Sequence, residues 1–247
     1  MPVNFRNFDF SYERDGKRIF AQSDLGTRIG KDIARKVGAK YRFDPFVFHI
    51  RKSGGHVAAL HTHRNHHFFA RVDIRRFFYG IGRNRVRRAL SGIAIERANH
   101  YAKWSCVKNP YDGPTYVLPY GFVQSPILAT LVLLESQLGA LLRELDADPR
   151  ISVTLYMDDI TISSDEIDVL NCAFKRMVET LEPAGFDANL DKLREPQPKM
   201  DLFNCSLVNA QTEVLPDRVD RFHAELRSAQ SLEAFDRYCS SVAEGNA

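Results

Sequence analysis

Apolar residues recur along this chain with two different periods, which together predict a mixed α+β fold. Helical spacing of apolar positions predicts helices at residues 24–37, 84–98, 127–145, 167–181, 218–229 and 232–242. Alternating or continuous runs of β-forming residues predict a central strand at 68–78, strand pairs at 44–60 and 101–117, and a tight hairpin at 151–163. A helix that follows this hairpin, with a further strand after it, is typical of a ferredoxin-like arrangement.

The predicted hairpin at 151–163 carries two adjacent carboxylates at its turn. Asp158 and Asp159 stand between two β-forming runs. Like charges repel, and Asp-Asp is a poor turn sequence compared with Asn-Gly, so fold stability alone does not explain the pair. Adjacent carboxylates on a rigid turn suit Mg²⁺, which prefers oxygen ligands and shares them with substrate phosphates.

A third carboxylate, Asp73, stands within the expected central strand, after its most apolar part. Alternation places Asp73 on the same face as Phe69 and Arg71, opposite a face of aliphatic residues. A carboxylate in this place is usually a strand cap. Metal ions bound by the Asp158-Asp159 pair could also be bound by Asp73, so we expect Asp73 to be catalytic instead.

The composition allows a substantial core and indicates an anionic partner. With 247 residues, 44% of them hydrophobic, the chain can form one composite domain or two small ones. The net charge is only +3, but arginines crowd around Asp73, namely Arg71, Arg75, Arg76, Arg83, Arg85, Arg87 and Arg88. This cluster fits a polyanion such as nucleic acid. For the arginines of the predicted helix, a solvated basic face is an equally good interpretation.

Cysteine and histidine do not form a recognisable metal pattern. The four cysteines are widely spaced, without the pairs expected of a zinc site or a disulfide framework, so we expect reduced thiols. Six of the eight histidines lie between His49 and His67, with no acidic residue or cysteine among them. We favour a loop or strand bearing polar histidines over a metal site. With Arg64, these histidines are also candidates for contact with nucleic-acid phosphates.

The hydropathy of the chain predicts no membrane segment. The start lacks a basic stretch followed by an apolar run, so we expect no secretory signal. The most apolar stretch, residues 127–134, is too short to span a bilayer. We therefore expect a cytoplasmic protein.

Four motifs in order resemble those of reverse transcriptases. Tyr156-Met157-Asp158-Asp159 resembles the catalytic box of that family. Upstream, the segment 73–78 resembles the first-aspartate strand, and Leu118–Pro126 resembles the Leu-Pro-Gln-Gly…Ser-Pro loop. Downstream, Gly185-Phe186, with Asn189 and Lys192, resembles the Gly-Phe…Asn…Lys segment. The resemblance covers about residues 44–209 and is closest to the compact bacterial branch of retron, group II intron and phage-defence enzymes.

The resemblance implies a right-hand polymerase fold. It implies a fingers-like region at residues 1–65, a ferredoxin-like palm at 66–210 and a short helical thumb at 211–247. Residues 202–209 look like the primer-grip hairpin, without its usual glycine. Because the thumb is short, a partner protein or a structured non-coding RNA is expected to complete the clamp on nucleic acid.

The resemblance also assigns roles to single residues. Asp73, Asp158 and Asp159 would hold two Mg²⁺ ions, with Mn²⁺ as an alternative, and add dNTPs to a DNA or RNA primer on an RNA template. The residues implied at the nucleotide are Ile74, Phe78, Tyr120, Gly121 and Lys192. Phe78 would exclude a ribose 2′-hydroxyl, although Phe77 and Phe78 also suit simple core packing.

Three departures from the family pattern leave other functions open. Tyr120 stands where glutamine is common. In the predicted hairpin at 44–60, Arg51 and Lys52 are candidates for gripping the triphosphate, but His56 stands where an arginine is expected. With the short thumb, these departures motivate untemplated or protein-primed DNA synthesis in antiphage defence. A non-enzymatic alternative is an RNA-binding scaffold on a decayed polymerase fold.

Overall fold

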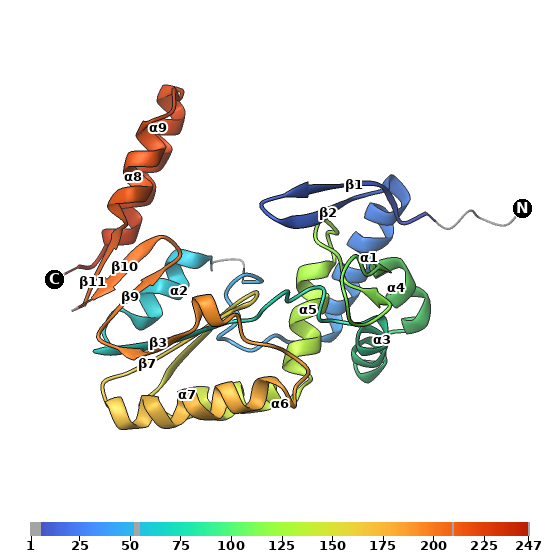
Figure 1. The fold of residues 1–247 in the computed structure, drawn as a ribbon, viewed down its shortest axis with the longest axis horizontal. Helices are drawn as coiled ribbons and strands as arrows, with labels where there is room; N and C mark the ends of the chain where they lie inside the picture. Colours follow the sequence, from blue (N-terminus) through green and yellow to red (C-terminus); the bar gives the residue numbers. More distant parts are fainter. Residues whose placement is uncertain (1–5, 52–54, 209, 247) are drawn as a thin grey trace, which may run out of the picture. The chain divides into compact units, whose positions relative to one another are not determined.

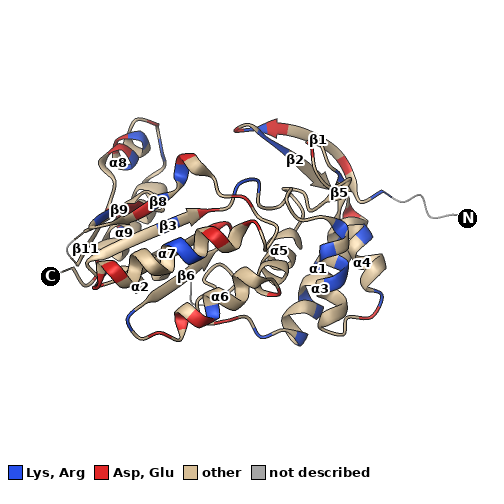
Figure 2. Ribbon diagram, turned by 60° about the horizontal axis from the view of Figure 1, so that its bottom comes forward, with Lys and Arg blue, Asp and Glu red and all other residues tan. Residues whose placement is uncertain are grey.

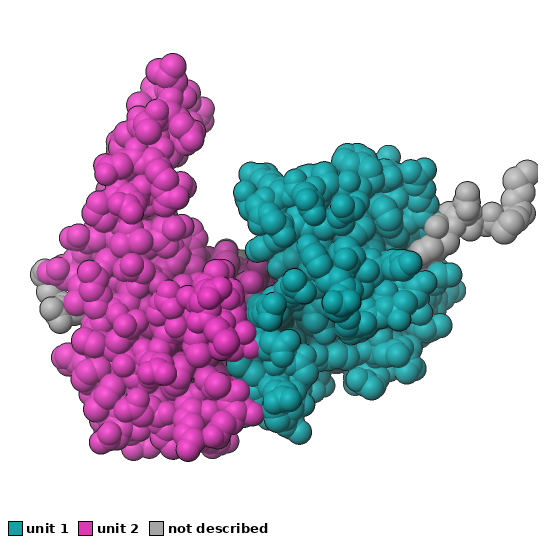
Figure 3. All heavy atoms as spheres, viewed as in Figure 1, with its two compact units in different colours: residues 1–44, 74–140, 180–187 teal, residues 45–73, 141–179, 188–247 magenta. Residues whose placement is uncertain are grey.

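The computed structural model describes residues 6–51, 55–208 and 210–246, and the chain forms two compact units. Unit 1 comprises residues 1–44, 74–140 and 180–187, and unit 2 comprises residues 45–73, 141–179 and 188–247 (Figure 3). Each unit is therefore built from three separate stretches of sequence. The expected α+β class is confirmed. The division at residues 65 and 210 stays a prediction, because it concerns functional regions rather than packing.

Unit 2 is organised around a four-stranded antiparallel sheet with the strand order β6-β7-β3-β8. Its strands are β3 (Phe68–Asp73), β6 (Ser152–Tyr156), β7 (Asp159–Ser164) and β8 (Arg194–Gln197). The central position of β3 and the tight β6–β7 hairpin confirm two of the sequence predictions. Helix α7 (Ile167–Leu181) lies along one side of this sheet (Figure 1). It follows its predicted bounds and buries Leu170 and Met177.

The predicted strand at 68–78 ends five residues early, at Asp73. Residues 75–80 form turns, and Arg76 adopts a positive φ of 48°. Phe77 and Phe78 are nevertheless buried, in unit 1, where the Phe77 ring lies 5.9 Å from that of Phe186. An apolar pattern reports burial, and a turn that buries its aromatic residues produces the same pattern as a strand.

The hairpin predicted at 44–60 is wrong, because none of the described residues in this range forms a strand. Val47 forms a parallel bridge with Leu155, but helix α2 (His56–His63) follows instead of a second strand. Gly55, with a φ of 95°, stands at the N-cap position of this helix, a conformation that favours glycine. The glycine that suggested a hairpin turn therefore precedes a helix. Lys52, one of the residues expected to grip the triphosphate, lies outside the described residues.

The end of the chain forms a second sheet and two helices in unit 2. The sheet has the order β11-β10-β9, with β9 (Lys199–Leu202), β10 (Cys205–Val208) and β11 (Gln211–Val214). Phe203 and Asn204 both have positive φ in the β9–β10 turn, as a type I′ hairpin turn requires. The expected hairpin is therefore present as far as Val208, and residue 209 lies outside the described residues. Helices α8 (Pro216–His223) and α9 (Ala229–Ala243) confirm two helices here, with shifted ends.

Unit 1 begins with a hairpin that the sequence interpretation missed. Strands β1 (Phe8–Arg14) and β2 (Lys17–Gln22) turn at Asp15-Gly16, both with positive φ. Asp-Gly is a strong signal for such a turn, so this element was predictable. Helix α1 (Asp24–Lys40) follows as expected, and the Ser23 hydroxyl caps it by accepting the Gly26 N–H.

Two further predictions in unit 1 need correction. The helix expected at 84–98 is α3 (Arg83–Gly92), which ends where the chain reverses through Ala94 at a φ of 53°. The strand pair expected at 101–117 shrinks to β4 (Val107–Lys108) and β5 (Tyr116–Val117), because α4 (Ala98–Ser105) occupies its first part. Asn84 lies inside α3 and does not cap it.

The long apolar helix expected at 127–145 is broken in two. Helix α5 (Ser125–Leu134) is almost entirely buried, and α6 (Gln137–Asp146) follows after a break at Glu135-Ser136. The Ser125 hydroxyl donates to the Pro119 carbonyl at 2.7 Å instead of capping α5. Gly139 packs so closely that a Cβ would lie 2.3 Å from the Leu134 carbonyl oxygen. No single helix among the described residues is long and apolar enough to cross a membrane, although α5 and α6 pass that test as a bent pair.

Candidate active site

The β6–β7 turn presents two of the three candidate carboxylates. Tyr156 and Asp159 face each other in the register of the hairpin, so Met157 and Asp158 form the turn itself. Met157 adopts a positive φ of 59°. For a residue with a Cβ this conformation costs roughly 1–2 kcal/mol, and such strain is concentrated at functional sites. The turn therefore has a geometry that favours presentation of Asp158 over local stability.

The sheet brings Asp73 to the same place. β3 pairs with β7 so that Asp73 and Asp159 are direct partners. Asp73, more than eighty residues before Asp158 and Asp159 in sequence, thus meets this pair at one end of the sheet, as the sequence motifs predicted. Asp73 is only 3% exposed, so its charge requires partners.

Cationic and amide groups supply those partners. Lys192 Nζ lies 3.0 Å from Asp73 Oδ2, and Asn189 Nδ2 donates to Asp73 Oδ1 at 2.9 Å. The Arg71 Nε donates to Asp159 Oδ1 at 2.6 Å, and both of these side chains are largely buried. Burial raises the pKa of Asp159, and the Arg71 guanidinium offsets part of this effect. The site is therefore an arrangement of acidic groups balanced by fixed cations.

The carboxylates of the site fit Mg²⁺, an ion whose coordination can be shared between the protein and a substrate. No three acidic, histidine or cysteine side chains within residues 6–51, 55–208 and 210–246 converge as a ready-made metal cage. Mg²⁺ does not require one, because it is commonly held by one or two carboxylates together with substrate phosphates and water. Ion binding at Asp159 would compete with the Arg71 guanidinium.

The residues expected at the nucleotide divide between the two units. Lys192 lies in unit 2 and contacts Asp73 directly. The other four belong to unit 1, where Phe78 packs edge-on against Tyr120 with ring centroids 4.7 Å apart. Ile74 is buried in the same unit. Sequence reasoning therefore identified a local aromatic cluster in unit 1 as well as the carboxylate site in unit 2.

Gly121 has a packing role that the sequence did not reveal. It adopts a φ of 99°, and a Cβ here would lie 2.3 Å from the Phe20 carbonyl oxygen. The Phe20 N–H also donates to the Tyr120 carbonyl at 2.9 Å. Glycine is thus required at position 121 for the close approach of β2. Bringing the protein backbone close to a nucleotide would be an additional role of Gly121.

The arginine cluster serves more than one purpose. Arg71 pairs with Asp159, and Arg85 donates to the carbonyls of Ala184 and Gly185 while stacking on the Phe186 ring. Arg87 and Arg88 are exposed on α3. Lys and Arg residues are also prominent on α1 and α3 (Figure 2). The basic surface of unit 1 suits nucleic acid, but two members of the cluster hold the protein together.

The histidines form a hydrogen-bonded network on and beside α2. Both ring nitrogens of the fully buried His63 have hydroxyl partners, Ser163 at 2.7 Å and Thr154 at 2.8 Å. His66 bonds to Ser152, and His67 to Asp165. Ordinary polar histidines are therefore the better interpretation, although helix α2 rather than a loop or strand carries three of the six.

Replacement of His63 by Leu is expected to destabilise the protein by about 2 kcal/mol at pH 7, because two buried hydroxyls lose their partner. Burial lowers the pKa of His63 to about 3, so the unfolded chain binds a proton that the folded chain rejects. Wild-type stability should therefore fall as the pH drops from about 6.5 towards 3, by up to about 1.4 kcal/mol per pH unit.

Chemical denaturation of both proteins between pH 7 and 4 measures this difference. The leucine side chain of the variant cannot titrate, so the stability gap between wild type and variant should narrow as the pH falls. A gap that stays constant would show that His63 takes up its proton equally well in the folded protein.

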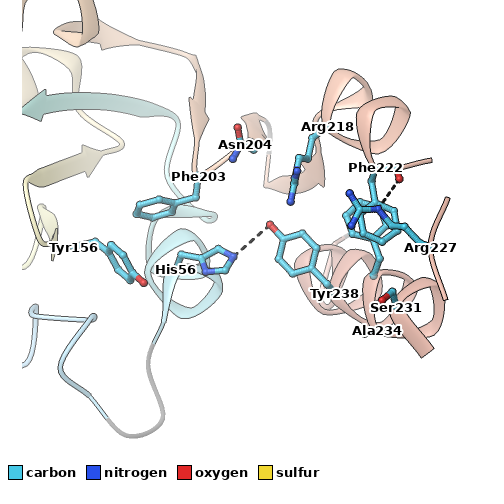
Figure 4. A pocket seen from close by; sticks show the side chains of 11 residues that line it. His56, Tyr156, Phe203, Asn204, Arg218, Phe222, Arg227, Ser231, Ala234 and Tyr238 are labelled. Atoms are coloured by element: carbon cyan, nitrogen blue, oxygen red, sulfur yellow. Dashed lines mark hydrogen bonds between the residues drawn. The ribbon is translucent and has the colours of Figure 1, made fainter. Parts of the chain in front are cut away.

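A cavity of about 600 Å³ lies next to the β6–β7 turn in unit 2 (Figure 4). Tyr156, Phe203 and Phe222 line it with His56, Arg218 and Tyr238. His56 Nε2 is 3.3 Å from the Tyr238 hydroxyl. His56 thus faces helix α9. Its position does not support a contact with the triphosphate of a bound nucleotide.

Sequence reasoning did not identify two residues that contact the site. Arg71 was noticed only as part of the basic cluster, and His49 only as one of the histidines. His49 Nδ1 accepts the Met157 N–H at 3.0 Å across 108 residues of sequence. No sequence signal links these pairs, because each depends on how separate strands align.

The fold is consistent with the fingers-palm architecture of polymerases. Residues 25–202 match the sequence model of the family described as reverse transcriptase (RNA-dependent DNA polymerase). The chain therefore belongs to the reverse transcriptase family. No curated protein sequence matches it significantly.

Two solved structures are similar to this chain, and the first of them supports the fold. The foamy viral protease-reverse transcriptase dRH in complex with double-stranded DNA matches over 91% of this chain, with a TM-score of 0.52 and 16% identity. The foamy viral protease-reverse transcriptase in complex with an RNA/DNA hybrid matches over 72%, with a TM-score of 0.47 and 17% identity. The chain spans only 33% and 22% of the length of these two proteins.

Proposed function

We propose that this chain catalyses addition of deoxynucleotides to a primer on an RNA template, with two Mg²⁺ ions. The observation that carries the proposal is the meeting of Asp73 with the Asp158-Asp159 turn at one end of the β3–β7 ladder. Membership of the reverse transcriptase family supports the choice of reaction.

The residues of the site would act mainly by positioning and charge balance. Asp73 and Asp158 would hold the two metal ions, and Asp159 would support one of them. When bound, such ions activate a hydroxyl nucleophile and stabilise the charge on the leaving pyrophosphate. Lys192 would add positive charge beside Asp73, and Phe78 would exclude a ribose 2′-hydroxyl.

The partners and context follow from the same features. An RNA template, a DNA or RNA primer and dNTPs would bind, and the basic faces of α1 and α3 suit nucleic-acid backbone. The order of the motifs supports a place in the compact bacterial branch, in a retroelement or in antiphage defence. A partner protein or structured RNA would contribute to the clamp on nucleic acid.

Incorporation of labelled dNTPs by the purified protein tests the proposal. The reactions contain Mg²⁺ and either poly(rA)/oligo(dT), co-purified RNA or no template. We expect incorporation that depends on the template and on Mg²⁺, and that Asp158→Asn abolishes. Absence of label under every condition, with co-purified RNA present, would contradict a polymerase.

Two other functions remain as outcomes of this assay. Incorporation without template would favour untemplated or protein-primed synthesis, an alternative motivated by Tyr120, which packs on Phe78 where glutamine is common. An RNA-binding scaffold would bind RNA unchanged after all three aspartates are replaced by asparagine, and would incorporate no label.

A further inference from the structure

The catalytic turn is held from outside its sheet by residues 46–49. β6 is the edge strand, and this segment runs beside it in parallel, with Val47 opposite Leu155. The Leu155 N–H donates to the Phe46 carbonyl at 2.8 Å, and the Phe48 N–H donates to the Leu155 carbonyl at 3.0 Å. A single parallel bridge therefore lies just before the turn.

His49 continues this pairing with its side chain. In a regular parallel ladder the next bond would join the Met157 N–H to the Phe48 carbonyl. That carbonyl instead accepts the N–H groups of Arg51 and Gly55, at 3.4 and 3.3 Å. The Met157 N–H donates to His49 Nδ1 at 3.0 Å. The imidazole thus takes the place of a backbone acceptor.

The bond acts at the strained point of the turn. Met157 has a positive φ and immediately precedes Asp158. The His49 ring also packs edge-on against Tyr156, with centroids 5.8 Å apart. An accepting Nδ1 requires a neutral ring with its proton on Nε2. Burial lowers the pKa of His49 to about 4, so the ring is neutral near pH 7.

We propose that His49 is a positioning residue for polymerisation: its Nδ1 fixes the left-handed Met157 and thereby sets the direction in which Asp158 points. This role rests on the proposed function of the turn. It differs from the role of the aspartates, because His49 acts through a backbone N–H. It also gives the segment before α2 a purpose that the sequence did not indicate.

Two substitutions separate the hydrogen bond from the ring contact. His49→Phe keeps an aromatic ring beside Tyr156 but removes the acceptor, whereas the side chain introduced by His49→Asn can place an oxygen where Nδ1 lies. We expect His49→Phe to lower kcat for dNTP addition roughly tenfold, from loss of one hydrogen bond at a strained residue. KM for the nucleotide should change less than twofold, and His49→Asn should recover most of kcat.

Hydrogen exchange at the Met157 amide gives a readout that does not require activity. Exchange should be faster in His49→Phe than in wild type and nearly normal in His49→Asn. His67→Asn, which changes a histidine bonded to Asp165 away from the turn, is the matched control and should alter neither exchange nor kcat.

Unchanged Met157 exchange in His49→Phe would overturn the proposal, as would equal losses of kcat in His49→Phe and His49→Asn. Should the wild-type protein incorporate no nucleotide at all, the proposed polymerase function fails. The exchange measurement then decides separately whether His49 fixes the turn.

Discussion

Replacement of Asp73 by Asn should lower the rate of dNTP addition by a factor on the order of 10³ or more, because a lost metal ligand removes several kcal/mol of charge stabilisation. Asp73 is the most buried of the three carboxylates, and it accepts hydrogen bonds from Lys192 and Asn189. Asn preserves the shape but not the charge. Single-turnover extension of a labelled primer measures the loss.

The same variant should also bind divalent ions more weakly, which can be followed by titration with Mn²⁺ monitored by electron paramagnetic resonance. Asp191→Asn is the matched control, because Asp191 is exposed on the short helix η1 (Leu190–Lys192) and its carboxylate is not part of the site. Circular dichroism should show both variants folded. Activity of folded Asp73→Asn within tenfold of wild type would refute a metal-binding role for Asp73.

Replacement of Phe78 by Val should reduce discrimination against ribonucleotides by roughly ten- to a hundredfold, the range that a change of a few methylenes in a pocket allows. The prediction follows if the Phe78 ring occupies the space that a 2′-hydroxyl would need. The ratio of kcat/KM for dATP to that for ATP, on one primer-template, measures the effect. Activity with dATP should fall less than the ratio does.

Phe77→Leu is the matched control for this prediction. The Phe77 ring lies beside Phe186 and is buried, so its substitution should lower stability without altering the choice of sugar. If Phe78→Val lowers the use of both nucleotides equally, together with stability, then Phe78 is a core residue and the aromatic cluster with Tyr120 serves packing alone.

The elements nearest to the chemistry were predictable because their signals are local. The Asp158-Asp159 pair between two β-forming runs indicates the hairpin, although the two turn residues are Met157 and Asp158. The apolar stripe of α7 specifies both ends of that helix. The three aspartates were identified from the sequence, partly from these patterns and partly from the order of the motifs. Asp15-Gly16 shows that a further hairpin was also available from local sequence.

Element boundaries were less predictable where burial and periodicity disagree. Phe77 and Phe78 extend the strand pattern past Asp73, although they pack in a turn of unit 1. Glu135 and Ser136 interrupt an apolar run that reads as one helix. In each place the apolar residues are buried as the pattern indicates, but the backbone conformation depends on neighbours that periodicity does not describe.

The sequence by itself determined the carboxylates, the hairpin that carries two of them and the class of fold. Only the tertiary structure decided which groups balance and orient those carboxylates. Arg71 reaches Asp159 across 88 residues, and His49 reaches Met157 across 108. Both contacts depend on how separate segments align when the protein folds. The free energy that sets this alignment comes from the burial of whole sheet faces rather than from any local preference.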